Sequence, residues 1–104
     1  MAQRGSSPTF RPTWRGERLD AVIDVRSKLE FWLGHLEGAT CISVDIIGDE
    51  LSNRPDIGRD DAILVYCASG ARSAAAAAEL KRRGYTNVID GGGMAQAATK
   101  YSAT

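Results

Sequence analysis

Residues 62–73 read AILVYCASGARS, in which an apolar run leads through a loop of small residues into an alanine-rich segment. The run Ala62–Tyr66 is typical of a strand buried on both faces of a parallel sheet. The segment Ser73–Arg83 (SAAAAAELKRR) predicts a helix, because alanine is the best helix former and cations in the last turn suit the helix dipole. Cys67 is therefore expected at the carboxyl end of a buried strand, just before a helix begins.

Shorter segments on both sides of this unit repeat the alternation of strand and helix. Predicted strands cover residues 19–25, 40–44 and 87–90, and predicted helices cover residues 28–33, 45–51 and 94–100, with residues 53–60 as a loop and residues 91–93 as a turn. Ser27 is the expected N-cap of the first helix. This alternation predicts an α/β domain with a mostly parallel central sheet flanked by helices on both faces. Such domains bind ligands at the carboxyl ends of the strands, where Asp24, Arg26 and Cys67 are expected.

Length and composition narrow the classes of function. A chain of 104 residues predicts one compact domain, which we assign to residues 19–104, preceded by an irregular N-terminal arm over residues 1–18. Thirteen basic and thirteen acidic side chains cancel, so no net field draws the chain to nucleic acid or to a membrane surface. No apolar run approaches the roughly 20 residues of a membrane helix. We expect a cytoplasmic monomer or homodimer without nucleic-acid or membrane partners.

The loop Cys67–Ser73, CASGARS, combines a nucleophile with the features of an anion hole. A short turn with a glycine can point several backbone N–H groups inward, and the following helix adds its partial positive charge there. A thiolate in this position has a depressed pKa and is a strong nucleophile. We predict that Cys67 is catalytic and that the rest of the loop binds substrate, namely Ala68, Ser69, Gly70, Ala71, Arg72 and Ser73. The alternative is that Cys67 is a small buried apolar residue that ends a strand.

Three stretches, in one order and at compatible spacing, resemble the motifs of the rhodanese family. Residues 65–73 (VYCASGARS) are similar to its active-site segment VYCxSGxRS, and residues 24–39 (DVRSKLEFWLGHLEGA) to its DVR, EF and GHIPGA motifs. Residues 84–94 (GYTNVIDGGGM) are similar to its G[FY]xxVxxLxGGM stretch. The resemblance implies a rhodanese-like fold and a sulfurtransferase without a cofactor. Such an enzyme carries sulfur as a persulfide on Cys67, from a donor such as thiosulfate to a thiol or cyanide acceptor.

Some positions depart from the family pattern. Ala68 stands where many members have arginine, so the loop has one cation fewer and we expect weak binding of thiosulfate. Glu37 replaces a usual proline, and Ala97 stands near the place of a common tryptophan. Both changes are expected to affect packing more than chemistry. The amino-terminal strand and helix of the family have no clear counterpart in residues 1–18.

Four residues outside the loop have both a structural and a chemical interpretation. Asp24 and Arg26 can form an ion pair that supports the loop, which we favour, or Arg26 can contact substrate. His35, the one histidine of the chain, is expected to fix a turn, because an ionised thiolate needs no base. Cys41 is expected to fill space in a strand, with a resolving role as the alternative. One histidine and two distant cysteines predict no metal site.

Two other functions remain open from the sequence. Cysteine phosphatases and arsenate reductases also hold a thiolate in a strand-to-helix loop with an arginine. Those enzymes place five residues between the cysteine and the arginine, whereas only four residues separate Cys67 from Arg72. The shorter loop favours transfer of one sulfur atom over transfer of a tetrahedral oxyanion. The second alternative is a non-catalytic or carrier module that receives sulfur from a protein partner, which the neutral Ala68 permits.

Overall fold

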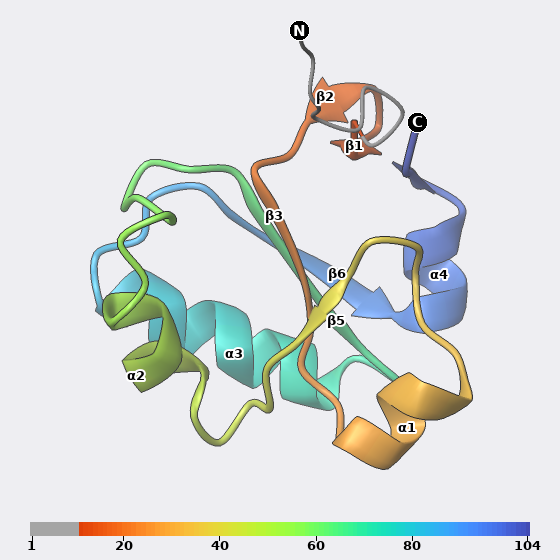
Figure 1. Ribbon diagram of the computed structural model, residues 1–104, viewed down its shortest axis with the longest axis horizontal. Helices are drawn as coiled ribbons and strands as arrows, with labels where there is room; N and C mark the ends of the chain where they lie inside the picture. Colours follow the sequence, from red (N-terminus) through yellow and green to blue (C-terminus); the bar gives the residue numbers. More distant parts are fainter. Residues whose placement is uncertain (1–10) are drawn as a thin grey trace, which may run out of the picture.

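A four-stranded parallel sheet forms the centre of the molecule in the computed structural model, which describes residues 11–104 (Figure 1). Its strands stand in the order β4-β3-β5-β6 and cover Ala21–Asp24 (β3), Thr40–Cys41 (β4), Ile63–Cys67 (β5) and Val88–Gly93 (β6). Parallel pairing brings the carboxyl ends of the strands to one edge of the sheet, with Asp24 in register with Cys41 on one side and with Tyr66 on the other. The α/β class predicted from the sequence is confirmed.

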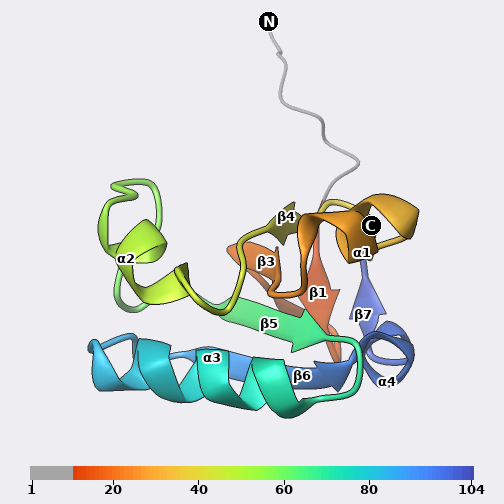
Figure 2. The same cartoon turned by 90° about the horizontal axis from the view of Figure 1, so that it is seen from below.

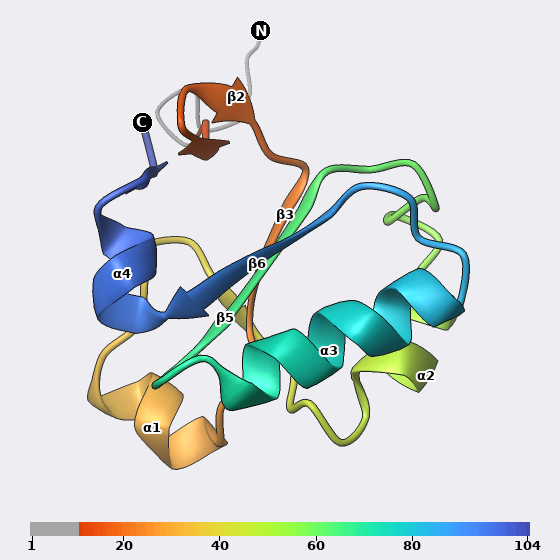
Figure 3. The same cartoon turned by 180° about the vertical axis from the view of Figure 1, so that it is seen from behind.

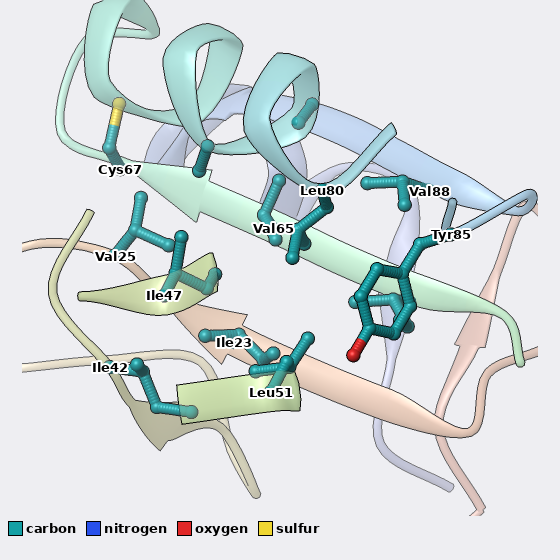
Figure 4. Close-up of a cluster of buried hydrophobic side chains, with 13 residues drawn as sticks. Ile23, Val25, Ile42, Ile47, Leu51, Val65, Cys67, Leu80, Tyr85 and Val88 are labelled. Atoms are coloured by element: carbon teal, nitrogen blue, oxygen red, sulfur yellow. The ribbon is translucent and has the colours of Figure 1, made fainter. Parts of the chain in front are cut away.

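Helices cover both faces of this sheet (Figures 2 and 3). They span Lys28–Leu33 (α1), Ile47–Ser52 (α2), Ala71–Arg82 (α3) and Met94–Ala98 (α4). On one face α2 and α3 bury Ile47 and Leu80 against the inward side chains of the sheet, such as Val65 (Figure 4). On the other face Ala97 of α4 packs with Leu64 and other buried side chains. The sheet is buried on both sides, which explains why β5 is an unbroken apolar run.

Helix α1 differs from the other helices because it buries none of its side chains. It begins with a capping box, in which the Ser27 hydroxyl accepts from the backbone N–H of Glu30 and the Glu30 carboxylate accepts from the backbone N–H of Ser27. The predicted N-cap is thus confirmed. Leu29, Trp32 and Leu33 are 66%, 79% and 72% exposed, so this helix has no packed apolar face. The capping box and contacts at its ends stabilise its position instead.

A second, small antiparallel sheet occupies the region that the sequence predicted to be an irregular arm. Its order is β2-β1-β7, from Glu17–Arg18 (β2), Thr13–Trp14 (β1) and Tyr101–Ser102 (β7). The prediction is therefore wrong for residues 13–18. A tight turn at Arg15 and Gly16, both with positive φ, joins β1 to β2, and Trp14 packs on the core together with Tyr101. Residues 1–10 lie outside the described residues, and the boundary at residue 19 stays a prediction.

Several element boundaries differ from the predictions, and two of the differences shape the site. Strand β6 continues through Gly91–Gly93, which the sequence analysis interpreted as a turn. Helix α3 begins at Ala71, two residues earlier than predicted, so that Arg72 and Ser73 lie in its first turn. Strand β4 ends at Cys41, earlier than the expected Val44. The first two differences bring backbone from β6 and α3 close to Cys67.

Candidate active site

The site forms where β5 ends and the chain turns into α3. Gly70 caps the helix with φ +114°, a left-handed conformation that residues with a Cβ rarely adopt, so glycine is required for this turn. Cys67 is 0% exposed and its sulfur lies on the α3 side of the sheet (Figure 4). The predicted placement of Cys67 at a strand end beside a helix N-terminus is confirmed.

Backbone N–H groups converge on the sulfur of Cys67. The N–H of Gly70 donates to Sγ over 3.0 Å, and the N–H of Ser73 donates to it over 3.3 Å. Ser73 lies in the first turn of α3, whose N–H groups have no partner within the helix. The Ser73 hydroxyl donates to the carbonyl oxygen of Gly70 over 3.0 Å, which closes the loop into a compact ring. These donors form a cradle suited to a negatively charged sulfur.

Opposing effects act on the Cys67 thiol, and their balance favours the thiolate. Burial is the largest single effect and raises the pKa of Cys67. The nearby Ser73 hydroxyl and the backbone N–H groups of Ser73, Gly70 and Ser69 lower it. Together these donors outweigh burial, so the pKa of Cys67 is lower than that of an ordinary thiol. The inward N–H groups expected from the sequence are thus present, and their role as an anion hole for substrate stays a prediction.

The glycines at the end of β6 form the far wall of this cradle. Gly93 is in register with Cys67, and a Cβ on Gly93 would lie 2.6 Å from the carbonyl oxygen of Ala68. No real Cβ approaches backbone so closely, so glycine is required for the contact between β6 and the loop. The Ser73 hydroxyl also lies 3.5 Å from the carbonyl oxygen of Gly92. Sequence reasoning missed this role, although three glycines in a row directly after an apolar strand were the available signal.

Arg72 does not stand free beside the loop. Its guanidinium forms a two-pronged ion pair with Glu30 of α1, with NH1 2.7 Å from Oε1 and NH2 3.0 Å from Oε2. Hydrogen bonding from Arg72, together with that from Ser27, lowers the pKa of Glu30 to about 2. Glu30 was not predicted from the sequence to belong to this site. The available signal was the spacing from Ser27 to Glu30, which is typical of a capping box and fixes the position of the carboxylate.

The buried pair of Asp24 and Arg26 supports the same edge of the sheet. Arg26 Nη2 lies 2.7 Å from Asp24 Oδ2, and both side chains are almost completely buried. The same guanidinium donates to the carbonyl oxygen of Gly34 over 2.6 Å, which ties the end of β3 to the end of α1. Hydrogen bonding to Asp24 raises the pKa of Arg26. Both charges are satisfied internally, which agrees with the scaffold interpretation of this pair.

His35 and Cys41 lie away from the sulfur of Cys67. The His35 ring stacks on Phe31 at 3.6 Å between centroids, and its Nδ1 lies 2.7 Å from the Phe31 carbonyl oxygen, so it holds the end of α1. Cys41 lines a cavity of about 290 Å³ with Arg26 and Lys28. Strand β3 separates β4 from β5, so the backbones of these two strands lie about 10 Å apart. Cys41 and Cys67 are therefore too far apart to form a disulfide without backbone movement.

The remaining loop residues form the rim of the cradle: Ala68, Ser69 and Ala71 are exposed. They offer small side chains and no charge, and the loop's own cation, Arg72, is already paired with Glu30, as the nearby Arg26 is with Asp24. Within residues 11–104, no group of three or more His, Cys, Asp or Glu side chains is arranged to hold a metal ion. No helix in that range has the length and apolar character needed to cross a membrane.

Comparisons with known sequences extend over nearly the whole described chain. Residues 12–97 match the sequence profile of the rhodanese-like domain. The probable adenylyltransferase/sulfurtransferase MoeZ of Mycobacterium tuberculosis is 33% identical over 95 residues, which cover 85% of this chain and 24% of that protein. The tRNA uridine(34) hydroxylase of Erwinia tasmaniensis is 35% identical over 75 residues, covering 67% of this chain and 21% of that protein. The chain thus spans about a quarter or less of the length of these curated relatives.

Solved structures resemble the fold over a similar range. A rhodanese with anions from E. coli superposes with a TM-score of 0.70 at 27% identity, over 81% of this chain and 98% of that chain. The human single-domain sulfurtransferase TSTD1 superposes with a TM-score of 0.62 at 25% identity, over 69% of this chain and 75% of that chain. These neighbours are themselves small proteins of one domain, whereas the curated sequence relatives are much longer chains.

Proposed function

The chain belongs to the rhodanese-like domain family, and from that membership we propose that it transfers sulfane sulfur through a persulfide on Cys67. One observation carries the proposal. The donors of the loop meet at the sulfur atom itself, with the N–H groups of Gly70 and Ser73 at 3.0 and 3.3 Å from Sγ. A group so held is prepared to act as a thiolate and, after the first transfer, to keep a charged second sulfur close to the same donors.

In the first half-reaction the Cys67 thiolate attacks the outer sulfur of a donor such as thiosulfate. A bond forms between Sγ and that sulfur, the sulfur–sulfur bond of thiosulfate breaks, and sulfite leaves with the bonding electron pair. The negative charge of the protein moves from Sγ to the new terminal sulfur. Because Cys67 is 0% exposed, neighbouring side chains at the rim must move aside before a donor reaches it.

In the second half-reaction a thiophilic acceptor takes the terminal sulfur. With cyanide, carbon attacks that sulfur, the bond to Sγ breaks, thiocyanate leaves and the Cys67 thiolate is restored. No proton has to be moved in either step when both attacking groups are anions. This supports a site without a general base, and it agrees with the position of His35 at the end of α1.

The phosphatase alternative requires a wider ring of donors. A phosphoryl group in its transition state carries charge on three equatorial oxygens, which need donors around them at a distance from the sulfur. Here the N–H groups of Gly70 and Ser73 already donate to Sγ. The backbone of Gly93, which has no Cβ, lies against the loop and closes the far side of the cradle. The arrangement favours a single transferred sulfur atom over a phosphoryl group.

A carrier module that exchanges sulfur with a protein partner is the second candidate. The observation that favours it is the uncharged rim of the loop, where Ala68 and Ser69 are exposed. A rim without a cation attracts a small anion weakly, whereas a protein donor can use contacts elsewhere on the surface. A carrier of this kind would turn over thiosulfate with cyanide poorly and would still accept sulfur from a protein persulfide.

Intact mass measurement after incubation with thiosulfate, and separately with an aryl phosphate, tests the proposal. We expect thiosulfate to add the mass of one sulfur atom to the wild-type protein, cyanide to remove it, and the aryl phosphate to stay unhydrolysed. Cys67→Ser is the control that should gain no sulfur. Phosphate release without any gain of sulfur would refute the sulfurtransferase proposal and support the phosphatase alternative.

A further inference from the structure

We propose that Glu30 is a specificity-determining residue that directs the site toward sulfur donors with at most one negative charge and away from dianions such as thiosulfate. This inference rests on the proposed sulfurtransferase function. It concerns Arg72, a cation of the loop that an anionic donor could recruit, and the carboxylate of Glu30 that already occupies it.

The ion pair joins two elements that flank the cradle. Arg72 lies where the loop enters the first turn of α3, and Glu30 lies at the third position of α1. Both terminal nitrogens of the guanidinium are engaged, at 2.7 and 3.0 Å from the two carboxylate oxygens. A guanidinium fork that is filled by one carboxylate cannot offer the same face to a sulfonate or sulfate-like group. A dianionic donor must therefore displace Glu30 or bind without this cation.

The carboxylate of Glu30 is itself held in place from the other side. Its Oε1 accepts from the Ser27 backbone N–H and from the Ser27 hydroxyl, each over 3.0 Å. Arg72 is the main cause, and Ser27 a further one, of a Glu30 pKa lowered to about 2, so Glu30 is ionised wherever the Cys67 thiolate exists. The capping box of α1 already positions the Glu30 carboxylate for Arg72. A donor that displaced Glu30 from Arg72 would have to break these contacts.

The balance of charge around the thiolate points the same way. Arg72 is compensated by Glu30, and the buried Arg26 is compensated by Asp24. Neither of these paired arginines offers a free positive charge to balance the Cys67 thiolate, and the rim residue Ala68 adds no cation. An approaching dianion is repelled about twice as strongly as a monoanion, since the Coulomb energy scales with the product of the charges.

A matched pair of small donors tests this directly. Thiosulfate carries two negative charges, and the methanethiosulfonate anion carries one, because a methyl group replaces an anionic oxygen. Cys67 attacks the outer sulfur of either donor, and sulfite or methanesulfinate leaves with the electron pair. The measured quantity is the ratio of kcat/KM for thiosulfate to that for methanethiosulfonate, with cyanide as the acceptor.

Glu30→Gln is the decisive variant, because glutamine keeps the side-chain length and can still serve in the capping box. We expect this variant to raise the ratio about two- to fivefold, the range of a partly exposed ion pair. Glu79→Gln is the control, since Glu79 also pairs with arginines, Arg82 and Arg83, but at the far end of α3. It should leave the ratio unchanged. In an Arg72→Ala background, Glu30→Gln should change the ratio less.

The outcomes separate the two proposals. If the wild-type protein gains no sulfur from either donor, the sulfurtransferase function fails, and this inference fails with it. If sulfur is gained but Glu30→Gln leaves the ratio unchanged, or lowers turnover of both donors in proportion, Glu30 is only structural and the inference alone is overturned. An equal rise in the ratio with and without Arg72 would overturn the assignment of the effect to the ion pair.

Discussion

The two cysteines of the chain each end a strand of the same sheet, yet their surroundings favour opposite states of the thiol. Cys67 ends β5 and its sulfur accepts from the N–H groups of Gly70 and Ser73. Cys41 ends β4, and its sulfur faces a carbonyl oxygen, that of Arg26, at 3.7 Å. The pKa of Cys67 is lowered, whereas burial and the charge of Asp24 raise the pKa of Cys41.

A place at the carboxyl edge of a parallel sheet therefore does not by itself lower the pKa of a cysteine. What differs is the chain that follows. After Cys67 a turn through Gly70 leads directly into a helix of twelve residues, whose first turn points N–H groups back at the sulfur. After Cys41 the chain runs on without a helix until Ile47, so no such donors converge there. The lowered pKa of Cys67 is thus a property of the strand-to-helix turn.

The largest expected effect comes from exchanging each sulfur for oxygen. Cys67→Ser should abolish sulfur transfer and keep the fold, because serine is similar in size but cannot form a persulfide. Cys41→Ser should retain activity. Turnover with thiosulfate and cyanide, together with circular dichroism of each variant, measures both effects. Activity in the first variant, or its loss in a folded second variant, would reverse the roles that we assign to the two cysteines.

A smaller effect is expected when only the wall of the Cys67 cradle is changed. Gly93→Ala places a Cβ at 2.6 Å from the carbonyl oxygen of Ala68, so β6 or the loop must shift. We expect a loss of about 1–3 kcal/mol in the free energy of unfolding, as in other overpacked sites, and slower persulfide formation. Urea denaturation and stopped-flow transfer rates measure the two losses.

Gly58→Ala is the matched control for this prediction. A Cβ there meets only Asp61 at 3.6 Å, an ordinary contact, so stability and transfer rate should change little. Neither variant should alter the reactivity of Cys41. If Gly93→Ala is as stable and as active as the wild type, the close approach of β6 does not shape the cradle.

The smallest expected effect comes from the removal of one hydroxyl group from the cradle. Ser73→Ala loses one of the groups that lower the pKa of Cys67, and it also frees the carbonyl of Gly70. We expect the pKa of Cys67 to rise, because the thiolate loses a polar group that stabilises its charge. Ser52→Ala, which removes a hydroxyl bonded to the Gly48 carbonyl in α2, should leave it unchanged. Titration of the thiolate by its ultraviolet absorbance measures the shift.

Much of this difference between the two cysteines could be predicted from the sequence, because the signals that carry it lie within a few residues of each other. The apolar run of β5, the alanines of α3 and the Ser27 cap are signals within a few residues of each other, and all three elements are confirmed. The resemblance to rhodanese domains and the α/β fold are confirmed as well. Cys67 at the turn between β5 and α3 followed from these signals.

The parts that the sequence did not predict depend on contacts between distant segments. The pairing of β1 with β7 joins residues almost ninety positions apart, and neither strand exceeds two residues, too short for a recognisable period. The role of Gly93 requires knowing that β6 lies beside β5. The pairing of Glu30 with Arg72 joins α1 to α3, so Arg72 was interpreted as a free cation for the substrate.

The most direct test of the account is the rate of alkylation of each cysteine as a function of pH, in Cys41→Ser and Cys67→Ser variants that leave one thiol at a time. We predict that Cys67 reaches half of its maximal rate below pH of about 8.5, the value of an ordinary thiol, and that Cys41 does so above it. Coincident profiles for the two cysteines, or a Cys67 profile at or above that of a free thiol, would contradict the claim that the strand-to-helix turn creates a stabilised thiolate.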